Sequence, residues 1–447
     1  MLDFFTSIDD FVWGPPLLVL LVGTGIYLTI RLGLLQIIRL PKAFKLIFAE
    51  DKGEGDISSF AALATALAAT IGTGNIVGVA TAIKTGGPGA LFWMWIAAFF
   101  GMATKYAEGL LAIKFRTLDD QGNVSGGPMY YITHGFSGKW QIIAKPLAYF
   151  FAFAGVLVAW LGIGTFSQVN SITSSLQNSF GWSPKIVSVI LALITAAIIF
   201  GGIQSISKVS EKVVPFMAGL YIIAALIVIF ANFNQLLPVL EMVFQSAFTG
   251  KAAVGGFAGA TVMAAMRLGI ARGVFSNESG LGSAPIAAAA AKTEEPVEQG
   301  LISMTGTFID TIIICTLTGL AILVTRQWSG SLEGAPMTQA AFSSIFGTFG
   351  ELALTLSLVL FAFTTILGWS YYGERCFEFI FKSTKFLSFY RLIFVVMVAL
   401  GGYLTLEVVW KIADIVNGLM ALPNLIALLV LSPIILKESK SYFERHK

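Results

Sequence analysis

Charged residues are scarce in this chain. Asp, Glu, Lys and Arg together make up 12% of its 447 residues, while 56% are hydrophobic. Soluble domains carry about 25% charged residues, and a mean hydropathy of +0.82 leaves more apolar surface than a soluble core can bury. The composition therefore argues against a soluble protein and predicts a polytopic membrane protein.

Histidine and cysteine are nearly absent, with two of each. His134 and His446 stand far apart, and the chain shows no Ser/His/Asp or Cys/His set, phosphate-binding loop or metal cluster. Cys315 and Cys376 lie in or beside apolar segments without metal-ligand spacing, so we interpret both as packing residues. A net charge of +3 without a basic cluster gives no indication of nucleic-acid binding. We expect no enzyme activity, no cofactor and no obligate protein partner.

Long apolar stretches are what the sequence has in quantity. About twenty helical residues cross the ~30 Å hydrocarbon layer, and eleven stretches qualify, so we expect an all-α membrane protein. Three shorter amphipathic segments, 124–136, 235–249 and 338–346, are predicted to be interfacial or loop helices. The eleven predicted spans are 15–38, 57–83, 89–114, 145–177, 185–203, 212–231, 252–289, 297–325, 349–381, 389–406 and 410–436.

Lysine and arginine are distributed unevenly between alternate loops. One set of loops, which includes the C-terminal tail, holds 20 of them and the other set holds 5. Because Lys and Arg accumulate in cytoplasmic loops, we expect the N-terminus outside and the C-terminus in the cytoplasm of a multi-pass cell-membrane protein.

Without the first span, ten spans remain, in two groups of five. An odd number of spans in each half makes the second half enter the membrane from the opposite side, which gives an inverted repeat. We expect an extra N-terminal helix and cytoplasmic loop at 1–56, a first repeat at 57–231, an extracellular linker at 232–251, a second repeat at 252–436 and a cytoplasmic tail at 437–447.

The first helix of each half is interrupted by glycines and small polar residues. Thr70–Asn75 lies at the centre of the first, and Phe275–Gly280 lies near the middle of the second. Unpaired backbone groups cost several kcal/mol in hydrocarbon, so such breaks persist only where they line an enclosed cavity. Paired breaks in two halves indicate a transporter binding site between two discontinuous helices.

The first break offers backbone groups for a negatively charged ligand and for a positively charged one. Backbone N–H groups around Thr73, Gly74 and Asn75 open the following half-helix and would face a carboxylate. Carbonyls that end the preceding half-helix, from Ala68 to Ile71, are hard oxygen donors that suit sodium. Alternatively, Gly74 and Gly78 form a GxxxG helix-packing face.

The second break offers groups that suit an ammonium ion. These are carbonyls near Gly273, Val274 and Phe275, together with side-chain oxygens of Ser276 and Asn277. The two breaks together therefore suit a zwitterion.

Glu278 is costly within a membrane and is therefore a functional candidate. It could equally form a buried pair with Arg267 or Arg272, so we do not name it as a ligand. Lys105 and Glu108, three residues apart, are expected to form a local ion pair.

Other spans carry residues that could complete the site. Gln168 shares a helix face with Thr165, and the hydroxyls of Thr364 and Thr365 could complete a sodium site with the carbonyls of the first break. We assign no role to Asp310. Candidates for apolar pocket walls are Phe166, Phe275 and Trp369.

Four segments resemble the alanine or glycine:cation symporter family, and the similarity covers essentially the whole chain. They are Gly72–Ala80, Gly86–Ala90, Gly126–Tyr131 and Phe275–Pro285. The resemblance implies eleven helices, a LeuT-type five-plus-five inverted repeat and import of a small amino acid with sodium.

Residue by residue, the resemblance implies substrate contacts and a sodium site. Analogy with LeuT-type sites implies that sodium contacts the backbone oxygens of Ala68 and Ile71 and the side chains of Thr364 and Thr365. The substrate contacts would be Thr73, Gly74, Asn75, Gln168, Gly273, Val274, Phe275, Ser276 and Asn277, with Phe166 and Trp369 as walls.

We therefore expect a secondary active symporter for alanine or glycine. Proton coupling, a larger substrate and, from another class, a passive channel remain as alternatives. Uphill accumulation would exclude the channel.

Overall fold

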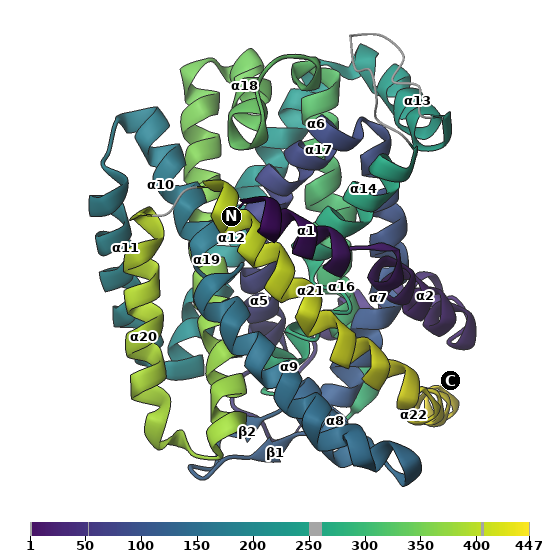
Figure 1. The fold of residues 1–447 in the computed structure, drawn as a ribbon. Helices are drawn as coiled ribbons and strands as arrows, with labels where there is room; N and C mark the ends of the chain where they lie inside the picture. The colour runs from purple at the N-terminus through teal and green to yellow at the C-terminus, as the bar shows by residue number, and fades with distance from the viewer. Residues whose placement is uncertain (1, 52, 250–261, 404–405, 447) are drawn as a thin grey trace.

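The computed structural model describes residues 2–51, 53–249, 262–403 and 406–446. The described chain is a bundle of helices with one small β-hairpin (Figure 1). Strands β1 (Thr117–Leu118) and β2 (Val124–Ser125) pair antiparallel, with Thr117 opposite Ser125. The hairpin lies at one end of the bundle and α18 (Gly334–Phe346) at the opposite end. We call these ends the hairpin face and the α18 face.

The remaining elements follow the predicted order of spans. The N-terminal part contains α1 (Leu2–Val12), α2 (Pro15–Arg31), α3 (Leu35–Ile38) and α4 (Leu40–Ile47). Next come α5 (Ser59–Thr70), η1 (Gly74–Gly78), α6 (Val79–Gly86), α7 (Gly89–Lys114), α8 (Pro128–Gly135), η2 (Gly138–Trp140), α9 (Gln141–Leu161), α10 (Phe166–Phe180), α11 (Pro184–Ile199), α12 (Gly202–Ala231) and α13 (Phe233–Thr249). The last part contains α14 (Val262–Asn277), α15 (Ala284–Ala288), α16 (Pro296–Thr307), η3 (Phe308–Cys315), α17 (Thr316–Val324), η4 (Gln327–Ser329), α19 (Thr348–Phe381), η5 (Thr384–Phe386), α20 (Leu387–Leu400), η6 (Gly401–Tyr403), α21 (Leu406–Val430) and α22 (Ser432–Arg445).

Among the described residues, seven helices are long and apolar enough to cross a membrane. A further pair, Ser59–Thr70 with Gly74–Gly86, passes the same test but bends by 51° at its break. Pro15–Arg31 and Pro184–Ile199 are shorter apolar helices. Exposed Ile186, Ile190 and Leu193 lie along one side of α11, where lipid instead of protein would cover them. The helical membrane fold expected from composition is confirmed.

The first break lies where the sequence predicts it. Ser58 caps α5 by accepting a hydrogen bond from the N–H of Ala61 at 3.0 Å. The helix ends at Thr70, Ile71 is extended, and η1 begins at Gly74.

The second break lies slightly later than predicted. α14 stays helical to Asn277, and the chain is irregular from Glu278 to Ser283. Three residues there have positive φ: Glu278 at 58°, Gly280 at 88° and Gly282 at 80°. Glycine adopts this region freely, whereas Glu278 is strained in it. The predicted start of this helix at 252, and the linker boundary at 251, lie outside the described residues.

Two interruptions were not predicted. The span expected over 145–177 breaks between α9 and α10 at Gly162–Thr165, and the span expected over 297–325 contains the π-helix η3. The first interruption contains Gly162 and Gly164, and a Cβ at Gly164 would lie 2.8 Å from the Trp369 Cβ, so close packing against a distant helix requires glycine there. The three short segments expected as interfacial or loop helices overlap α8, α13 and α18.

Candidate functional site

The two broken helices meet directly. A Cβ added at Gly74 would lie 3.0 Å from the Ser276 Cα, and one added at Gly72 would overlap the Thr365 hydroxyl. No larger residue fits these two positions without movement. The fold therefore brings the first break, the end of α14 and the middle of α19 together.

Two backbone N–H groups of the first break donate hydrogen bonds to side-chain oxygens. The N–H of Gly72 donates to Asn75 Oδ1 at 2.8 Å, and the N–H of Thr73 donates to Gln168 Oε1 at 3.3 Å. The Gln168 amide nitrogen has no hydrogen-bond partner among the described residues. Of the three N–H groups that the sequence predicts for a carboxylate, Gln168 of α10 thus lies at that of Thr73, while the N–H of Asn75 donates to Gly72 O at 3.3 Å.

Asp310, to which we assigned no role from the sequence, joins the two breaks. It accepts hydrogen bonds from Asn75 Nδ2 at 2.7 Å, Ser276 Oγ at 2.9 Å and Thr311 Oγ1 at 2.7 Å. The side chain is fully buried, and no salt bridge to it is found in the described parts of the chain. An acidic residue within an apolar span is itself the signal of a functional position.

The carbonyls of α14 differ from those expected. Val274 O accepts the N–H of Glu278 at 2.8 Å, and Gly273 lies inside the helix against Met94. Because only the last carbonyls of a helix lack internal partners, those of Phe275, Ser276 and Asn277 are the ones that α14 presents. The expectation that Gly273 and Val274 offer open carbonyls is wrong.

Asn277 is held by neighbours on two sides. Its Nδ2 donates to Thr311 Oγ1 at 2.9 Å, and its Oδ1 accepts the N–H of Ser279 at 2.9 Å. Asn277 therefore fastens the end of α14 to η3.

Oxygen atoms gather around Thr365, where the sequence predicts sodium. Its hydroxyl lies 3.2 Å from Ala68 O, 3.4 Å from Ile71 O and 3.0 Å from Phe361 O. The Thr364 hydroxyl lies 3.0 Å from the same Phe361 oxygen. Three carbonyls and two hydroxyls thus form one group. The Phe361 carbonyl was missed because any threonine in a helix can bond its own backbone.

The three candidate wall residues are all buried, but they have different neighbours. The Phe275 ring is next to Gly74, and the Arg272 guanidinium lies 5.4 Å from its ring centroid. Trp369 donates its Nε1–H to Glu278 Oε1 at 2.8 Å. Phe166 begins α10, two residues before Gln168.

Glu278 is fully buried and also accepts a hydrogen bond from the Ser283 hydroxyl. Arg272 instead forms a bidentate pair with Asp414 of α21, at 2.9 and 2.7 Å. The alternative in which Glu278 pairs with Arg272 is therefore wrong.

Glu108 holds the backbone of the second break. Its Oε1 accepts the N–H groups of Gly280 and Gly282 at 3.1 and 3.2 Å, and Asn424 Nδ2 at 2.6 Å. Asn424 also donates to Gly280 O at 2.9 Å. The Lys105 ammonium, by contrast, has no hydrogen-bond partner in the described ranges. The expected Lys105–Glu108 ion pair is absent there.

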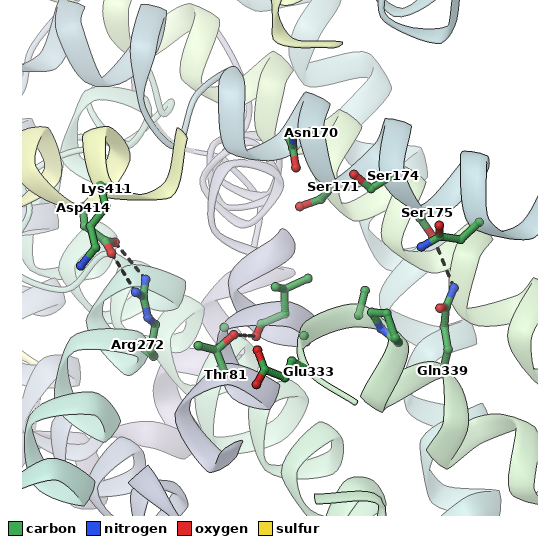
Figure 2. A pocket seen from close by; sticks show the side chains of 16 residues that line it. Thr81, Asn170, Ser171, Ser174, Ser175, Arg272, Glu333, Gln339, Lys411 and Asp414 are labelled. Carbon is green, nitrogen blue, oxygen red and sulfur yellow. Dashed lines mark hydrogen bonds and ion pairs between the residues drawn. The ribbon is translucent and has the colours of Figure 1, made fainter. Parts of the chain in front are cut away.

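A cavity of about 590 Å³ lies on the α18 side of these residues (Figure 2). Helices α6, α10, α14, α18 and α21 line it, and the Arg272–Asp414 pair lies in its wall. None of the predicted substrate residues is among its described lining residues. Arg272 is in contact both with this cavity and with Phe275, so it lies between the cavity and the junction of the breaks.

The hairpin face is closed by hydrogen bonds and ion pairs. Arg116, between α7 and β1, donates to the carbonyl oxygens of Ala289 at 3.0 Å, Ala291 at 2.7 Å, Glu54 at 2.8 Å and Thr293 at 2.9 Å. Burial lowers the pKa of Arg116, although the group stays charged at neutral pH. The loop after α7 is thereby tied to the chain that follows the second break.

Arg375 forms a second cluster on this face. It contacts Asp119, Glu374 and Glu378 at 3.2, 3.2 and 2.7 Å. Nearby, Asp56 accepts the N–H of Val124 at 2.9 Å, and burial raises the pKa of Asp56.

Comparison with known proteins places these features in a family. The model of the "Sodium:alanine symporter family" matches residues 1–447. An "Uncharacterized transporter" of Haemophilus influenzae is 55% identical over 445 residues, covering 99% of this chain and 96% of its own. The "Sodium/alanine symporter AgcS" of Methanococcus maripaludis is 51% identical over 450 residues, covering 99% and 97%. A crystal structure of MhsT with L-phenylalanine matches with a TM-score of 0.60 at 13% identity, covering 85% of this chain and 89% of MhsT; it supports the LeuT-type fold alone.

Proposed function

This chain belongs to the sodium:alanine symporter family, and we propose that it imports alanine or glycine with sodium by alternating access. Membership makes it a sodium-coupled amino-acid symporter, a multi-pass membrane protein and not an enzyme. The choice of a small substrate rests on the junction of the two breaks. The observation that supports amino-acid binding at this junction is that the backbone N–H groups of Gly72 and Thr73 donate hydrogen bonds to the side-chain oxygens of Asn75 and Gln168.

The amino-acid carboxylate binds at the first break. Its oxygens replace Gln168 Oε1 at the N–H of Thr73, with the N–H of Gly74 beside it and the helix dipole of η1 and α6 behind them. The Gln168 amide then turns its Nε2 towards the carboxylate. The bond that Gln168 makes here, at 3.3 Å, is long for a hydrogen bond and therefore easily exchanged.

The ammonium group binds at the end of α14. The carbonyls of Phe275, Ser276 and Asn277 are the acceptors, while the Asp310 carboxylate supplies the negative charge behind them. The direct approach of Gly74 to Ser276 leaves little room for a side chain. Phe166, Phe275 and Trp369 form the walls, so a methyl group or a hydrogen fits best.

Sodium binds at the five oxygens around Thr365. The ion draws together the carbonyls of Ala68, Ile71 and Phe361 and the hydroxyls of Thr364 and Thr365, and so fixes α5 against α19. Because this fixes the carbonyl end of the same break that holds the carboxylate, each ligand favours the binding of the other.

The hairpin face is cytoplasmic, because the loops that gather there carry most of the lysine and arginine. The cavity on the α18 face is then the outer entrance, and Arg272 with Asp414 narrows its inner end. A bundle that contains both broken helices rocks against the remaining helices around the site.

Transport by purified protein in liposomes tests this proposal. We expect an inward sodium gradient to drive alanine above its equilibrium concentration. Equal accumulation driven by a proton gradient alone would show proton coupling, and simple equilibration would show a channel. Competition by a panel of L- and D-amino acids separates small from larger substrates.

A further inference from the structure

A second, small polar cavity lies between α5, α7, α15 and α16. It is lined by Lys105, Gln299, Thr70 and Ser303, and otherwise mostly by small apolar residues such as Ala66 and Ala288. Its volume is about 10 Å³, which is room for one water molecule. The lining part of α5 begins at Ala62, close to the hairpin face, and ends at Thr70 beside the first break. The cavity therefore lies between the junction of the breaks and the hairpin face.

Two unpartnered polar atoms belong to residues that line this cavity. Lys105 is 3% exposed and Gln299 is 1% exposed. Lys105 Nζ and Gln299 Oε1 have no hydrogen-bond partner among the described residues. One is a cationic donor and the other is a neutral acceptor.

An ammonium group buried in this way is costly unless something compensates its charge. Lys105 interacts electrostatically with Glu108, Glu278 and Asp310. Each of these carboxylates is engaged elsewhere, by the second break, by Trp369 and by Asn75 respectively. These carboxylates compensate the charge of Lys105 from a distance, but among the described residues none accepts a hydrogen bond from Lys105 Nζ, so its N–H groups lack an acceptor.

We propose that Lys105 and Gln299 form a second, transient site for the transported amino acid on its way to the hairpin face. This rests on the proposed function. The substrate carboxylate binds Lys105 Nζ after leaving the first break, and its ammonium group binds Gln299 Oε1. The cavity widens when α5 moves away from α16, which the small residues on both helices permit. The site lowers the barrier to release by meeting both charges of the zwitterion inside the membrane.

Sided transport assays with a Lys105→Met variant test the proposal. Right-side-out vesicles present the α18 face and inside-out vesicles present the hairpin face, with alanine as the probe. We expect K105M to raise the KM measured from the hairpin face about tenfold or more, as expected for losing a hydrogen bond to a charged group. The KM from the α18 face stays within about twofold. Lys105→Arg keeps the charge and recovers most of the affinity.

Two further variants serve as controls. Lys114→Met removes a partly exposed lysine of the same helix, which pairs with Glu438, and should change neither KM. Gln299→Met removes the acceptor and should raise the KM on the hairpin face alone, by about threefold or more. If K105M does not fold, this variant tests the second site in its place. Absence of sodium-driven uptake by the unmodified protein would contradict the proposed function itself. If the unmodified protein transports alanine and these variants alter both faces equally, or neither, the second site is wrong.

Discussion

Gln168 bridges α10 and the first break through a single long hydrogen bond. Its oxygen lies 3.3 Å from the N–H of Thr73, and its nitrogen has no partner in the described chain. Such a residue costs little to displace. In the proposed mechanism it holds the place of the substrate carboxylate, and its loss is expected to affect binding more than folding.

Gln168→Leu tests the placeholder role. Because the variant loses the amide that would contact the carboxylate, we expect the alanine KM to rise about tenfold, which corresponds to about 1.4 kcal/mol. The melting temperature of the detergent-purified protein should change little. Uptake kinetics and a melting curve measure both quantities, and an unchanged KM would remove Gln168 from the site.

Thr365→Val tests the sodium group at the same scale. Valine keeps the shape but removes the oxygen that lies near Ala68, Ile71 and Phe361, so half-saturation by sodium should require about tenfold more sodium. Thr325→Val is the matched control, because the Thr325 hydroxyl bonds only its own helix backbone at 2.7 and 3.2 Å. If both variants behave alike, the hydroxyl of Thr365 is not a sodium ligand.

At the scale of elements, the second break has an irregular backbone, but backbone groups of Gly280 and Gly282 form hydrogen bonds with neighbouring helices. Glu108 of α7 accepts hydrogen bonds from the N–H groups of Gly280 and Gly282, and Asn424 of α21 donates one to Gly280 O. Two separate helices therefore hold one unwound segment inside the membrane. This explains how backbone that would be costly in lipid remains stable.

Glu108→Ala should destabilise the protein. The two glycine N–H groups and Asn424 lose their common acceptor, and each buried unsatisfied group costs about 1–3 kcal/mol. We expect a clearly lower melting temperature. Glu438→Ala, which removes only the partly exposed pair with Lys114, should change it by less because surface pairs contribute about 0–1 kcal/mol. Equal stability of the two variants would contradict this account.

The sequence predicted most elements but not how they are fastened. Apolar length located the spans, and glycine with small polar residues located both breaks, because these signals are local. The interruption at Gly162–Thr165 and the π-helix at Asp310 depend on contacts with distant helices. For the same reason, spacing along α7 predicted an ion pair between Glu108 and Lys105, and nothing in the sequence indicated that Asn424 is a hydrogen-bond partner of Glu108. Spacing along one helix reveals which residues share a face, but not which other helix packs against that face.

At the scale of the whole molecule, the two faces differ. The α18 face has a cavity of about 590 Å³, and the hairpin face has one of about 470 Å³ between the hairpin, α8, α9 and the end of α19. Between the breaks and the hairpin face lies a cavity of only about 10 Å³. Arg116 and Arg375 fasten the hairpin face through carbonyls and carboxylates. Because this fastening closes the hairpin face, we interpret the structure as the member of an alternating-access pair that is open at the α18 face, which is outward-facing in the proposed orientation.

Arg116→Ala should shift the protein away from this state. The variant loses hydrogen bonds to Ala289, Ala291, Glu54 and Thr293, so the hairpin face opens more often. In a background without Cys315 and Cys376, a Ser303→Cys reporter in the small cavity should react severalfold faster with a water-soluble maleimide. Slower or unchanged labelling would mean that Arg116 does not hold this face closed.

The central claim is that the two breaks bind sodium and the amino acid as one coupled site. Equilibrium binding of labelled alanine to purified protein, with and without sodium, tests it most directly. We expect sodium to tighten alanine binding, and alanine to tighten sodium binding by the same factor, because coupling between two ligands is reciprocal. Thr365→Val should abolish that factor. Alanine binding with the same Kd in the presence and absence of sodium would contradict the account.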